Sequence, residues 1–362
     1  MLRKARRHLF TILEHAGIFR VVANTRWRGR RLLILCYHGV SIADEHEWHP
    51  ELYVSPAVLR QRFGALRRGG YNVLPLGEAV DRLAAGTLPP KSVAITFDDG
   101  GYDFYARAYP LLREYGFPAT VYLTTYYSYY QRPVFDTGSS YVLWRGRGSS
   151  PLDLSDLIPG SPPMCLDTER GRRAAALRIR DYANSEDMSG EKKDRLLRRI
   201  AQRAGVDYEA VFGNRLLFLM TPNEVREVAA GGVDVQLHTH RHRTPHERQL
   251  FLREIDDNRG SIEAILGPGR REHFCYPSGV YTDEFLEWLP HAGVSSATTC
   301  DNALATSADN RLLLPRLVDT MNVAPVQFGA WLSGVADLVP HRRRAKDLGG
   351  HFSRQALQPT RL

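Results

Sequence analysis

Short hydrophobic runs alternate with longer amphipathic segments along most of the chain. A short run of apolar and β-branched residues is typical of a strand that is buried on both faces, as in a parallel sheet. These runs occupy residues 31–37, 71–76, 92–97, 119–124, 233–237, 273–276, 294–299 and 312–318. The segments with helical spacing lie between them, at residues 55–69, 77–85, 102–115, 221–230, 247–266 and 282–292.

Repeated strand–helix units imply a parallel sheet with right-handed crossovers. About seven or eight such strands favour a closed or nearly closed barrel over an open sheet, since a sheet of this size curls as it twists. The pattern therefore predicts an α/β fold built as a (β/α) barrel over residues 31–330.

The alternation stops between about residues 126 and 219. A stretch rich in proline, glycine and serine covers residues 146–163, and two charged helix-like segments follow at 169–182 and 191–204. This interval is too long for a plain loop, so we predict an inserted helical subdomain over one rim of the sheet.

Composition fits a large globular domain with reduced cysteines. The 362 residues are 43% hydrophobic, which is enough for a substantial core. The four cysteines lie far apart without a C-x-x-C pair, so we expect separate thiols rather than a disulfide framework.

Positive charge gathers at both ends of a chain whose net charge is +8. Residues 1–30 form a basic, mildly amphipathic segment, and residues 331–362 form a basic C-terminal tail. The first segment lacks the pattern of a secretory signal, and no run approaches the length of a membrane span, so we expect a cytoplasmic protein. The basic clusters predict peripheral contact with an anionic membrane, with simple solvation as the alternative. No recognition motif accompanies them, so nucleic acid is not an expected partner.

Two carboxylates, Asp98 and Asp99, directly follow the run at 92–97. Unpaired carboxylates are too costly in a hydrophobic core, so both must emerge at the carboxyl end of the strand, where barrels keep their binding sites. Successive strand residues point in opposite directions, which suits one carboxylate to a cation and the other to a proton. Taken alone, the same residues could form an ordinary Asp-Asp-Gly turn.

Histidines follow a second hydrophobic run, at residues 233–237. His238 and His242 are four residues apart and share a side, whereas His240 joins them only if the strand continues. Catalytic zinc sites usually have three protein ligands and an open position, which two histidines and one carboxylate would supply. The pattern predicts one divalent metal, with zinc expected and cobalt or nickel as alternatives.

Two further strand ends carry candidate polar groups. His38 follows the run at 31–37 and could donate a proton near neutral pH. The turn Pro277-Ser278-Gly279 follows the run at 273–276 and could present a backbone N–H to an oxyanion. A hydrogen-bonded core histidine and an ordinary turn are the alternatives.

In this order, the motifs resemble those of the polysaccharide deacetylases with NodB homology, carbohydrate esterase family 4, in the branch with an early Tyr-His-Gly motif. The resemblance runs from about Leu32 to Val318 and is interrupted by the insertion. It rests on Tyr37-His38-Gly39-Val40, Thr96-Phe97-Asp98-Asp99-Gly100, Phe117-Pro118-Ala119-Thr120, His238-Thr239-x-x-His242 and Phe274-x-Tyr276-Pro277-x-Gly279.

The resemblance implies a distorted (β/α) barrel of about seven parallel strands and metal-dependent removal of N-acetyl groups from amino sugars. It makes Asp98 the general base and assigns the metal to Asp99, His238 and His242. The residues that it implies for substrate binding are Tyr276, Pro277, Ser278, Gly279 and Arg316.

Three positions depart from the family pattern. Many members have an arginine, paired with the base, where Cys275 stands, and a tyrosine where Ser278 stands. Many also use a late histidine as the general acid, but the corresponding strand here contains Arg316, which could set local charge. The branch with the early motif is thought to use its histidine instead, which makes His38 the candidate acid.

The predicted function is N-deacetylation of an N-acetylated sugar in polysaccharide or glycolipid biosynthesis, at the inner face of the membrane. Hydrolysis of another linear or cyclic amide is the alternative within enzymes. A non-catalytic carbohydrate-binding protein is the alternative outside them, although binding alone would require neither Asp98 nor His38.

Overall fold

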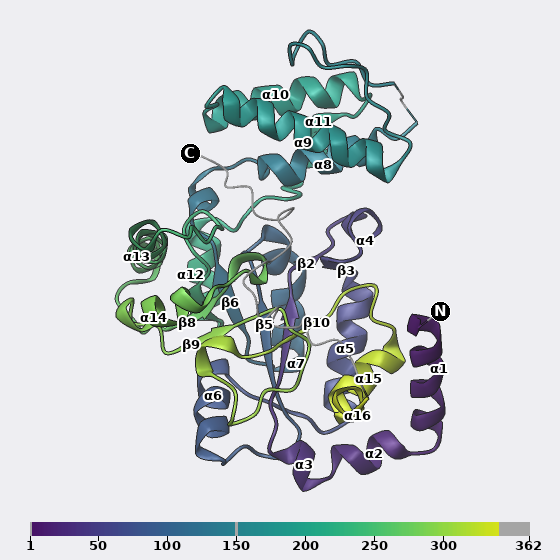
Figure 1. Ribbon diagram of the computed structural model, residues 1–362, viewed down its shortest axis with the longest axis vertical. Helices are drawn as coiled ribbons and strands as arrows, with labels where there is room; N and C mark the ends of the chain where they lie inside the picture. Colours follow the sequence, from purple (N-terminus) through teal and green to yellow (C-terminus); the bar gives the residue numbers. More distant parts are fainter. Residues whose placement is uncertain (1, 149–150, 340–362) are drawn as a thin grey trace.

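A curved parallel sheet forms the centre of the computed structural model, which describes residues 2–148 and 151–339 (Figure 1). The strands lie in the order β10-β1-β5-β6-β7-β8-β9, with β4 paired to β5 beside this path. They are β1 (Leu33–Tyr37), β4 (Asn72–Val73), β5 (Ser92–Phe97), β6 (Thr120–Leu123), β7 (Asp234–Leu237), β8 (His273–Cys275), β9 (Ser296–Thr298) and β10 (Leu317–Val318). All neighbouring pairs are parallel, and the seven strands of the path curl into a half-barrel. The predicted distorted (β/α) barrel is confirmed.

The centre of the sheet is its most hydrophobic part. All six residues of β5 and all five of β1 are buried. The two strands are in register along their length, from Leu33 opposite Val93 to Tyr37 opposite Phe97. Their carboxyl ends therefore lie side by side, which places His38 next to Asp98.

Two strands, β4 and β10, are far shorter than their hydrophobic runs. The run at 71–76 yields only β4, and the run at 312–318 yields only β10. A 3₁₀ turn, η4 (Arg311–Leu313), occupies the start of the second run because the Asn310 side chain accepts the Leu312 N–H at 2.9 Å. The prediction of a strand from residue 312 was therefore wrong in its extent.

Helices pack around the sheet and follow the predicted segments closely. Those of the barrel are α5 (Pro56–Arg68), α6 (Leu76–Ala85), α7 (Tyr109–Tyr115), α12 (Pro222–Ala230), α13 (Arg248–Leu266) and α14 (Asp283–His291). Capping residues explain where two of these helices begin. The Ser55 side chain caps α5, and Thr221 and Glu224 form a capping box at α12. The predicted helix at 102–115 is divided, since a π-helical turn, η1 (Phe104–Ala108), precedes α7.

The N-terminal helices pack against the last helices of the barrel. Helices α1 (Leu2–His15), α2 (Ile18–Ala23) and α3 (Arg26–Gly29) lie beside α15 (Pro325–Ser333) and α16 (Val335–Leu338) (Figure 1). Phe10 is 1% exposed and belongs to the barrel core, as does Trp331, which lies beyond the expected end of the barrel. The predicted basic tail falls outside the described residues from position 340 onward. No helix in the described ranges has the length and hydrophobicity needed to cross a bilayer.

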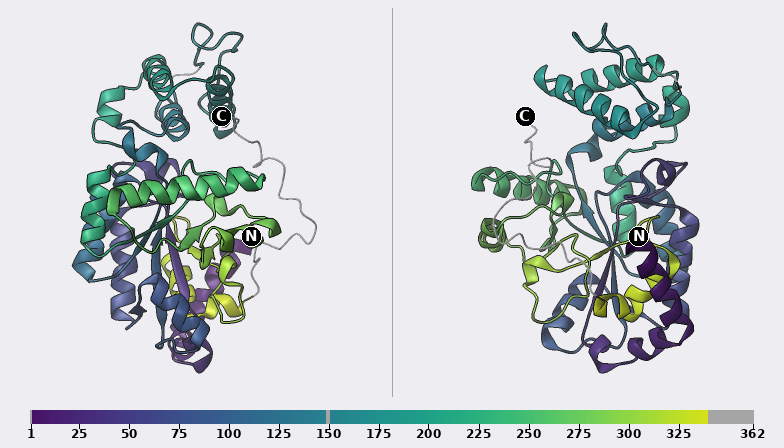
Figure 2. Two further views of the ribbon diagram at one scale, coloured as in Figure 1. Left: turned by 90° about the vertical axis from the view of Figure 1, so that its left-hand side faces the viewer. Right: turned by 45° about the vertical axis from the view of Figure 1, so that its right-hand side comes forward.

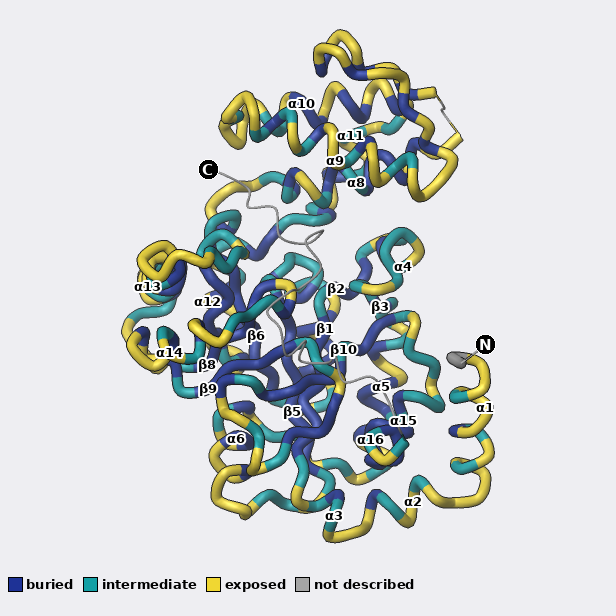
Figure 3. Tube along the Cα trace, viewed as in Figure 1, coloured by how far each residue is buried: buried dark blue, intermediate teal, exposed yellow. Residues whose placement is uncertain are grey.

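The segment at 126–219 is helical and has a hydrophobic core of its own. It contains η2 (Tyr126–Tyr129), α8 (Phe135–Arg145), α9 (Glu169–Ser185), α10 (Gly190–Arg203) and α11 (Tyr208–Phe212). The four α-helices gather at one end of the molecule (Figures 1 and 2), around a cluster that is separate from the barrel core. Figure 3 shows buried positions on the inner sides of these helices and exposed positions on their outer sides. A short helix of the barrel rim, α4 (Glu45–Trp48), lies nearest to them, and Trp48 packs on their core.

A small two-stranded sheet completes the same rim. It pairs β2 (Gly39–Val40) with β3 (Tyr53–Val54) directly after His38. The Asp103 carboxylate accepts the Val40 N–H at 2.6 Å, and burial raises the pKa of Asp103 to about 7. This bond holds the segment that carries His38 against the start of η1.

Candidate active site

Six predicted side chains meet at one rim of the sheet, among them His242 of the loop after β7. Asp98 and Asp99 follow β5, His38 follows β1, His238 follows β7, and Arg316 directly precedes β10. The two carboxylates face different partners, although both lie beyond the end of β5 and strand alternation is not the cause. Asp98 contacts Arg316, and Asp99 contacts histidines.

A buried ion pair holds Asp98. The Arg316 Nη1 and Nη2 atoms donate to Asp98 Oδ1 and Oδ2 at 2.7 and 2.8 Å, and the two side chains are 0% and 2% exposed. Burial alone would raise the pKa of Asp98, but the charge and hydrogen bonds of Arg316 outweigh it and hold that pKa well below its usual range. Asp98 is therefore ionised at neutral pH.

Two thiols complete the surroundings of Asp98. Cys36 Sγ lies 3.5 Å and Cys275 Sγ 3.4 Å from Asp98 Oδ2. Burial raises the pKa of both thiols well above the ordinary value, so both keep their protons and can donate weakly to the carboxylate. The arginine that the family pattern expects at position 275 is replaced by one that reaches the same carboxylate from beside β10.

Asp99 turns away from Asp98 because the backbone reverses there. Its φ is +70°, a left-handed conformation that is costly for a residue with a side chain. Gly100 follows with φ +78°, a conformation that favours glycine, and a Cβ at that position would lie 2.2 Å from the Leu123 side chain, which would have to move. The strained turn aims the Asp99 carboxylate at the loop after β7.

Asp99 Oδ1 lies 3.2 Å from His238 Nε2 and 3.1 Å from His242 Nε2. This oxygen is buried and has no hydrogen-bond partner. His238 Nδ1 lies 2.9 Å from the carbonyl oxygen of Cys275, so Nδ1 carries the proton and Nε2 presents its lone pair.

This group fits a divalent metal. One ligand atom from each of Asp99, His238 and His242 lies within 4.8 Å of the others. Bonds of about 2.0 Å in a tetrahedral zinc site place ligand atoms about 3.3 Å apart, close to the two observed separations. One carboxylate and two imidazoles form a donor set suited to zinc and related metals, and the unpartnered Asp99 oxygen marks the place.

The third histidine of the motif lies elsewhere. His240 Nδ1 is 2.8 Å from the Thr125 hydroxyl, and its ring packs against Tyr126 edge to face. β7 ends at Leu237, so the condition under which His240 would join the other two histidines is not met.

Helix α13 supports the loop that carries the histidines. Asn258 is 0% exposed, and its Oδ1 accepts the His238 N–H at 3.0 Å. Glu254, at 2% exposed, accepts the Arg241 N–H at 2.8 Å and a hydrogen bond from the Arg243 Nε at 2.8 Å. The sequence reading missed both residues, although two polar side chains four apart on the buried face of a helix could have indicated them.

His38 follows β1 and lies beside Asp98. Its Nε2 is 3.6 Å from Asp98 Oδ2, and its side chain is 18% exposed. Burial lowers the pKa of His38 despite the opposing charges of Asp98 and Asp99. The imidazole is therefore mostly neutral at pH 7 and has to gain a proton before it can act as an acid.

The residues expected to bind substrate differ in their access to it. Tyr276, Pro277 and Gly279 are buried, and the Tyr276 hydroxyl donates to the Leu312 carbonyl at 2.9 Å. Ser278 is exposed and has φ +56°, so it stands at the surface of the turn. Arg316 is fully buried with its terminal nitrogens directed at Asp98, a place behind the base rather than in contact with a substrate.

Comparison with known proteins finds similar sequences. The model of the polysaccharide deacetylase family matches residues 85–138 and 190–297. Over 100 residues the chain is 31% identical to the poly-beta-1,6-N-acetyl-D-glucosamine N-deacetylase of Escherichia coli K12, a match that covers 27% of this chain and 15% of that protein. The chain thus spans only a small part of this relative.

Solved structures share the fold. The deacetylase PplD of Streptococcus pyogenes, in complex with acetate, superposes with a TM-score of 0.54 at 20% identity, over 82% of this chain and 96% of that one. IcaB from Ammonifex degensii gives a TM-score of 0.53 at 19% identity, over 84% and 98%.

Removing the partner of Asp98 should destabilise the protein in a pH-dependent way. In the wild type the depressed pKa of Asp98 contributes stability above the unfolded pKa of about 3.9, and this contribution is lost as pH falls through the folded pKa. Arg316→Met removes the strongest interaction that opposes the effect of burial, so the pKa of Asp98 rises and its ionisation opposes folding. We expect a loss of about 3–5 kcal/mol in the free energy of unfolding near pH 8, and a smaller loss near pH 5.

Denaturant unfolding at the two pH values measures this difference. Arg195→Met on α10 is the matched control, because Arg195 is exposed, and this variant should unfold like the wild type. An equal loss for Arg316→Met at both pH values would contradict the assigned pairing.

The second prediction concerns the metal. The double variant His238→Ala, His242→Ala should lose a divalent metal that the wild type retains through dialysis, because only Asp99 would remain as a ligand. His240→Ala should keep it, since His240 faces Thr125. Elemental analysis of the purified proteins measures the metal content, and equal content in wild type and double variant would refute the ligand set.

Proposed function

Because the barrel of this chain belongs to the polysaccharide deacetylase family, we propose that the protein hydrolyses the acetamido group of an N-acetylated sugar in polysaccharide or glycolipid biosynthesis. The main support for the proposal is the short distance between the candidate base, Asp98, and the candidate metal ligands. A carboxylate oxygen of Asp98 lies within 4.8 Å of a ring nitrogen of His238, which itself belongs to the group with Asp99 and His242.

The cofactor in this proposal is one divalent metal held by Asp99, His238 and His242, with zinc expected and cobalt or nickel as alternatives. When bound, such an ion polarises the acetamide carbonyl and makes a neighbouring water more acidic. Asn258 and the Cys275 carbonyl hold His238 in the orientation and tautomer that this role requires.

Asp98 acts as the general base. Its low pKa keeps it ionised at working pH, and Arg316 fixes the plane of its carboxylate through two parallel hydrogen bonds. It takes a proton from the water as the water oxygen bonds to the acetamide carbon. We assign stabilisation of the oxyanion that forms to the Ser278 backbone N–H, because the Gly279 N–H donates to the Tyr276 carbonyl at 2.9 Å and the Val280 N–H to the Pro277 carbonyl at 3.1 Å.

His38 delivers the proton to the leaving nitrogen of the sugar. Its imidazole is neutral at rest, and its Nε2 lies 3.6 Å from Asp98 Oδ2. The proton taken by Asp98 passes to His38, which delivers it to the nitrogen as the carbon–nitrogen bond breaks. The products are acetate and the free amine, and both side chains return to their starting states.

Acetate release tests this function. Zinc-loaded protein should release acetate from N-acetylglucosamine oligomers, and Asp98→Asn should lower kcat by about 10²-fold or more while the metal content stays unchanged. Asp256→Asn, on the exposed side of α13, is the matched control and should be as active as the wild type.

Equal activity of Asp98→Asn and wild type would refute the assignment of Asp98 as the general base. If the protein hydrolysed another linear or cyclic amide and released no acetate from any N-acetylated sugar, the proposed substrate class would be wrong. If the protein bound metal and saccharide but hydrolysed neither N-acetylated sugars nor other amides, it would be a carbohydrate-binding protein and not an enzyme.

A second part of the proposal is contact between the N-terminal segment and an anionic membrane. One face of α1 and α2 is anchored by buried Phe10 and Ala23, while four large apolar side chains point outward. These are Leu9, Ile12, Ile18 and Val21, with exposed fractions of 40, 54, 37 and 64%. Exposed cations surround them, at Lys4, Arg7, Arg20, Arg26 and Arg30, and Glu14 is the one acidic residue in the first thirty positions. Apolar groups flanked by cations are the pattern of a segment that lies at a lipid surface.

Sedimentation with vesicles tests this contact. The protein should bind vesicles of phosphatidylcholine and phosphatidylglycerol, bind phosphatidylcholine alone weakly, and dissociate as salt is raised. Ile12→Ser with Val21→Ser should weaken binding, whereas Leu177→Ser, which removes a side chain 43% exposed on α9, should not. The contact would be refuted if the protein bound both kinds of vesicle equally. It would also be refuted if the Ile12→Ser, Val21→Ser variant bound as well as the Leu177→Ser variant. The cytoplasmic location stays a prediction, and cell fractionation should find the protein with membranes at low salt.

A further inference from the structure

A second group of potential metal ligands lies around Asp98. One ligand atom each from Cys36, His38 and Asp98 lies within 4.8 Å of the other two. Cys36 Sγ lies 3.5 Å and His38 Nε2 3.6 Å from Asp98 Oδ2, and Cys36 Sγ lies 4.0 Å from His38 Nδ1. In the proposed function Asp98 and His38 carry protons, whereas the Cys36 thiol takes no part.

The spacing of these atoms fits one tetrahedral ion. Bonds of about 2.3 Å to sulfur and about 2.0 Å to nitrogen or oxygen place a sulfur and an oxygen about 3.5 Å apart, and a nitrogen and an oxygen about 3.3 Å apart. The observed separations to Asp98 Oδ2 are 3.5 Å for the sulfur and 3.6 Å for the imidazole nitrogen. The three side chains can therefore bind one ion after small adjustments.

The types of donor favour a thiophilic ion. Thiolate sulfur and imidazole nitrogen bind zinc, cadmium and similar ions, whereas magnesium and calcium require mainly oxygen ligands. The group of Asp99, His238 and His242 contains no sulfur. The Cys36 thiol therefore distinguishes the second group from the first.

The charges around Cys36 allow a dication to bind. Arg316 pairs with Asp98 at 2.7 Å, so these two residues together add no net charge. Burial raises the pKa of the Cys36 thiol well above its ordinary value, so the thiol keeps its proton until an ion arrives. Binding then forms a metal–sulfur bond and releases this one proton to water, and no oxidant is needed. The nearby guanidinium makes this site weaker than the one at Asp99.

A third group has similar donors but is less suited to an additional ion. It consists of Asp98, His238 and Cys275. His238 is already a proposed ligand of the first ion, and Arg316 Nη2 lies 3.1 Å from Cys275 Sγ, where its positive charge opposes a metal. The group that contains Cys36 is therefore the better second site.

We propose that Cys36, His38 and Asp98 form a binding site for a second, thiophilic divalent ion, and that this ion inhibits the enzyme. The binding is independent of the proposed function, but the inhibition rests on it, because the ion occupies the oxygen that takes up a proton and the imidazole that delivers it. His38 is 18% exposed and the other two side chains are buried, so the ion enters past His38. The enzyme then works with one ion bound and stops when zinc is in excess.

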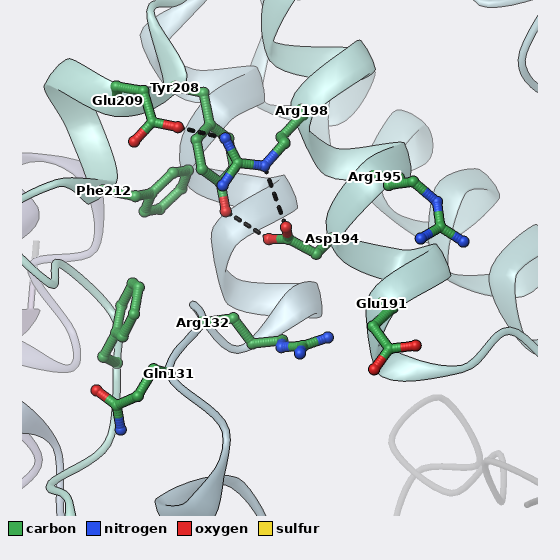
Figure 4. Close-up of a pocket in the computed structure, with 10 residues that line it drawn as sticks. Gln131, Arg132, Glu191, Asp194, Arg195, Arg198, Tyr208, Glu209 and Phe212 are labelled. Carbon is green, nitrogen blue, oxygen red and sulfur yellow. Dashed lines mark hydrogen bonds and ion pairs between the residues drawn. The ribbon is translucent and has the colours of Figure 1, made fainter.

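The carboxylates of the insertion provide a contrast. Glu191, Asp194 and Glu209 line a cavity of about 340 Å³ (Figure 4). Arg198 bonds to both Asp194 and Glu209. Among the described residues, no cysteine or histidine lines this cavity. Carboxylates without sulfur or imidazole neighbours do not select a thiophilic ion, so Glu191 serves as a control position.

Titration with cadmium tests the site. Protein loaded with one equivalent of zinc should develop the ultraviolet charge-transfer band of a cadmium–thiolate bond as Cd²⁺ is added, because the ligands at Asp99 include no sulfur. Cys36→Ser should weaken this binding about tenfold or more, and His38→Gln should weaken it as well. Cys165→Ser, which changes an exposed cysteine, and Glu191→Gln should retain the band.

The titration can also contradict the proposal. Absence of the band in the wild type, or unchanged cadmium affinity in Cys36→Ser, would overturn it. Loss of the band in Cys275→Ser but not in Cys36→Ser would place the ion in the third group and overturn it as well. These measurements need no substrate, so they test the site even if the protein releases no acetate.

Acetate release tests the inhibition. When zinc or cadmium saturates the second site, acetate release from N-acetylglucosamine oligomers should fall about tenfold or more, and the same concentration of Mg²⁺ should not lower it. Cys36→Ser should require more zinc for the same inhibition. Unchanged acetate release while the charge-transfer band is saturated would overturn the inhibitory role.

Discussion

The ion pair between Asp98 and Arg316 determines the arrangement of the whole site. Two charges buried at 2% and 0% exposure are tolerable only when each is fully paired, because removing ions from water costs several kcal/mol per ion. Here the remaining donors of Arg316 are also used: Nε donates to the Thr299 carbonyl at 2.9 Å, and Nη1 to the Thr96 hydroxyl at 3.1 Å. The arginine therefore joins the start of β10 to the ends of β5 and β9, across the two edges and the middle of the sheet, around one carboxylate.

This pairing also explains why adjacent carboxylates can have different chemistry. Arg316 and two thiols surround Asp98, which leaves the second carboxylate without a cation on the same side. The left-handed backbone at Asp99 and the glycine after it turn that side chain toward the histidine loop instead. The conformational cost of that turn is compensated once the Asp99 oxygen gains a partner, and strain of this kind is typical of functional sites.

Local patterns predicted the parts of the fold that depend on neighbouring residues. The hydrophobic run of β5, the ends of α5 and α12, and the convergence of Asp98, Asp99, His238 and His242 at one rim follow from periodicity and capping residues. The partner of Asp98 does not, because Arg316 is 218 positions away and its place depends on β10 lying beside β1. A buried arginine was assigned to substrate for the same reason, since a sequence shows its charge but not the carboxylate that neutralises it. The supporting role of Glu254 and Asn258 likewise depends on which face of α13 is turned to the loop.

The insertion joins the two halves of the site at its own boundaries. Its entry is bonded to the His240 carbonyl, within the loop that carries two of the proposed ligands. Its exit places the Phe218 carbonyl and the Met220 N–H against Tyr102 and Gly100, which follow the third ligand. Because the subdomain has a hydrophobic core of its own, it is a stiff body between these two attachments rather than a loose loop. The subdomain and the two segments that carry the proposed ligands are therefore held in one fixed arrangement.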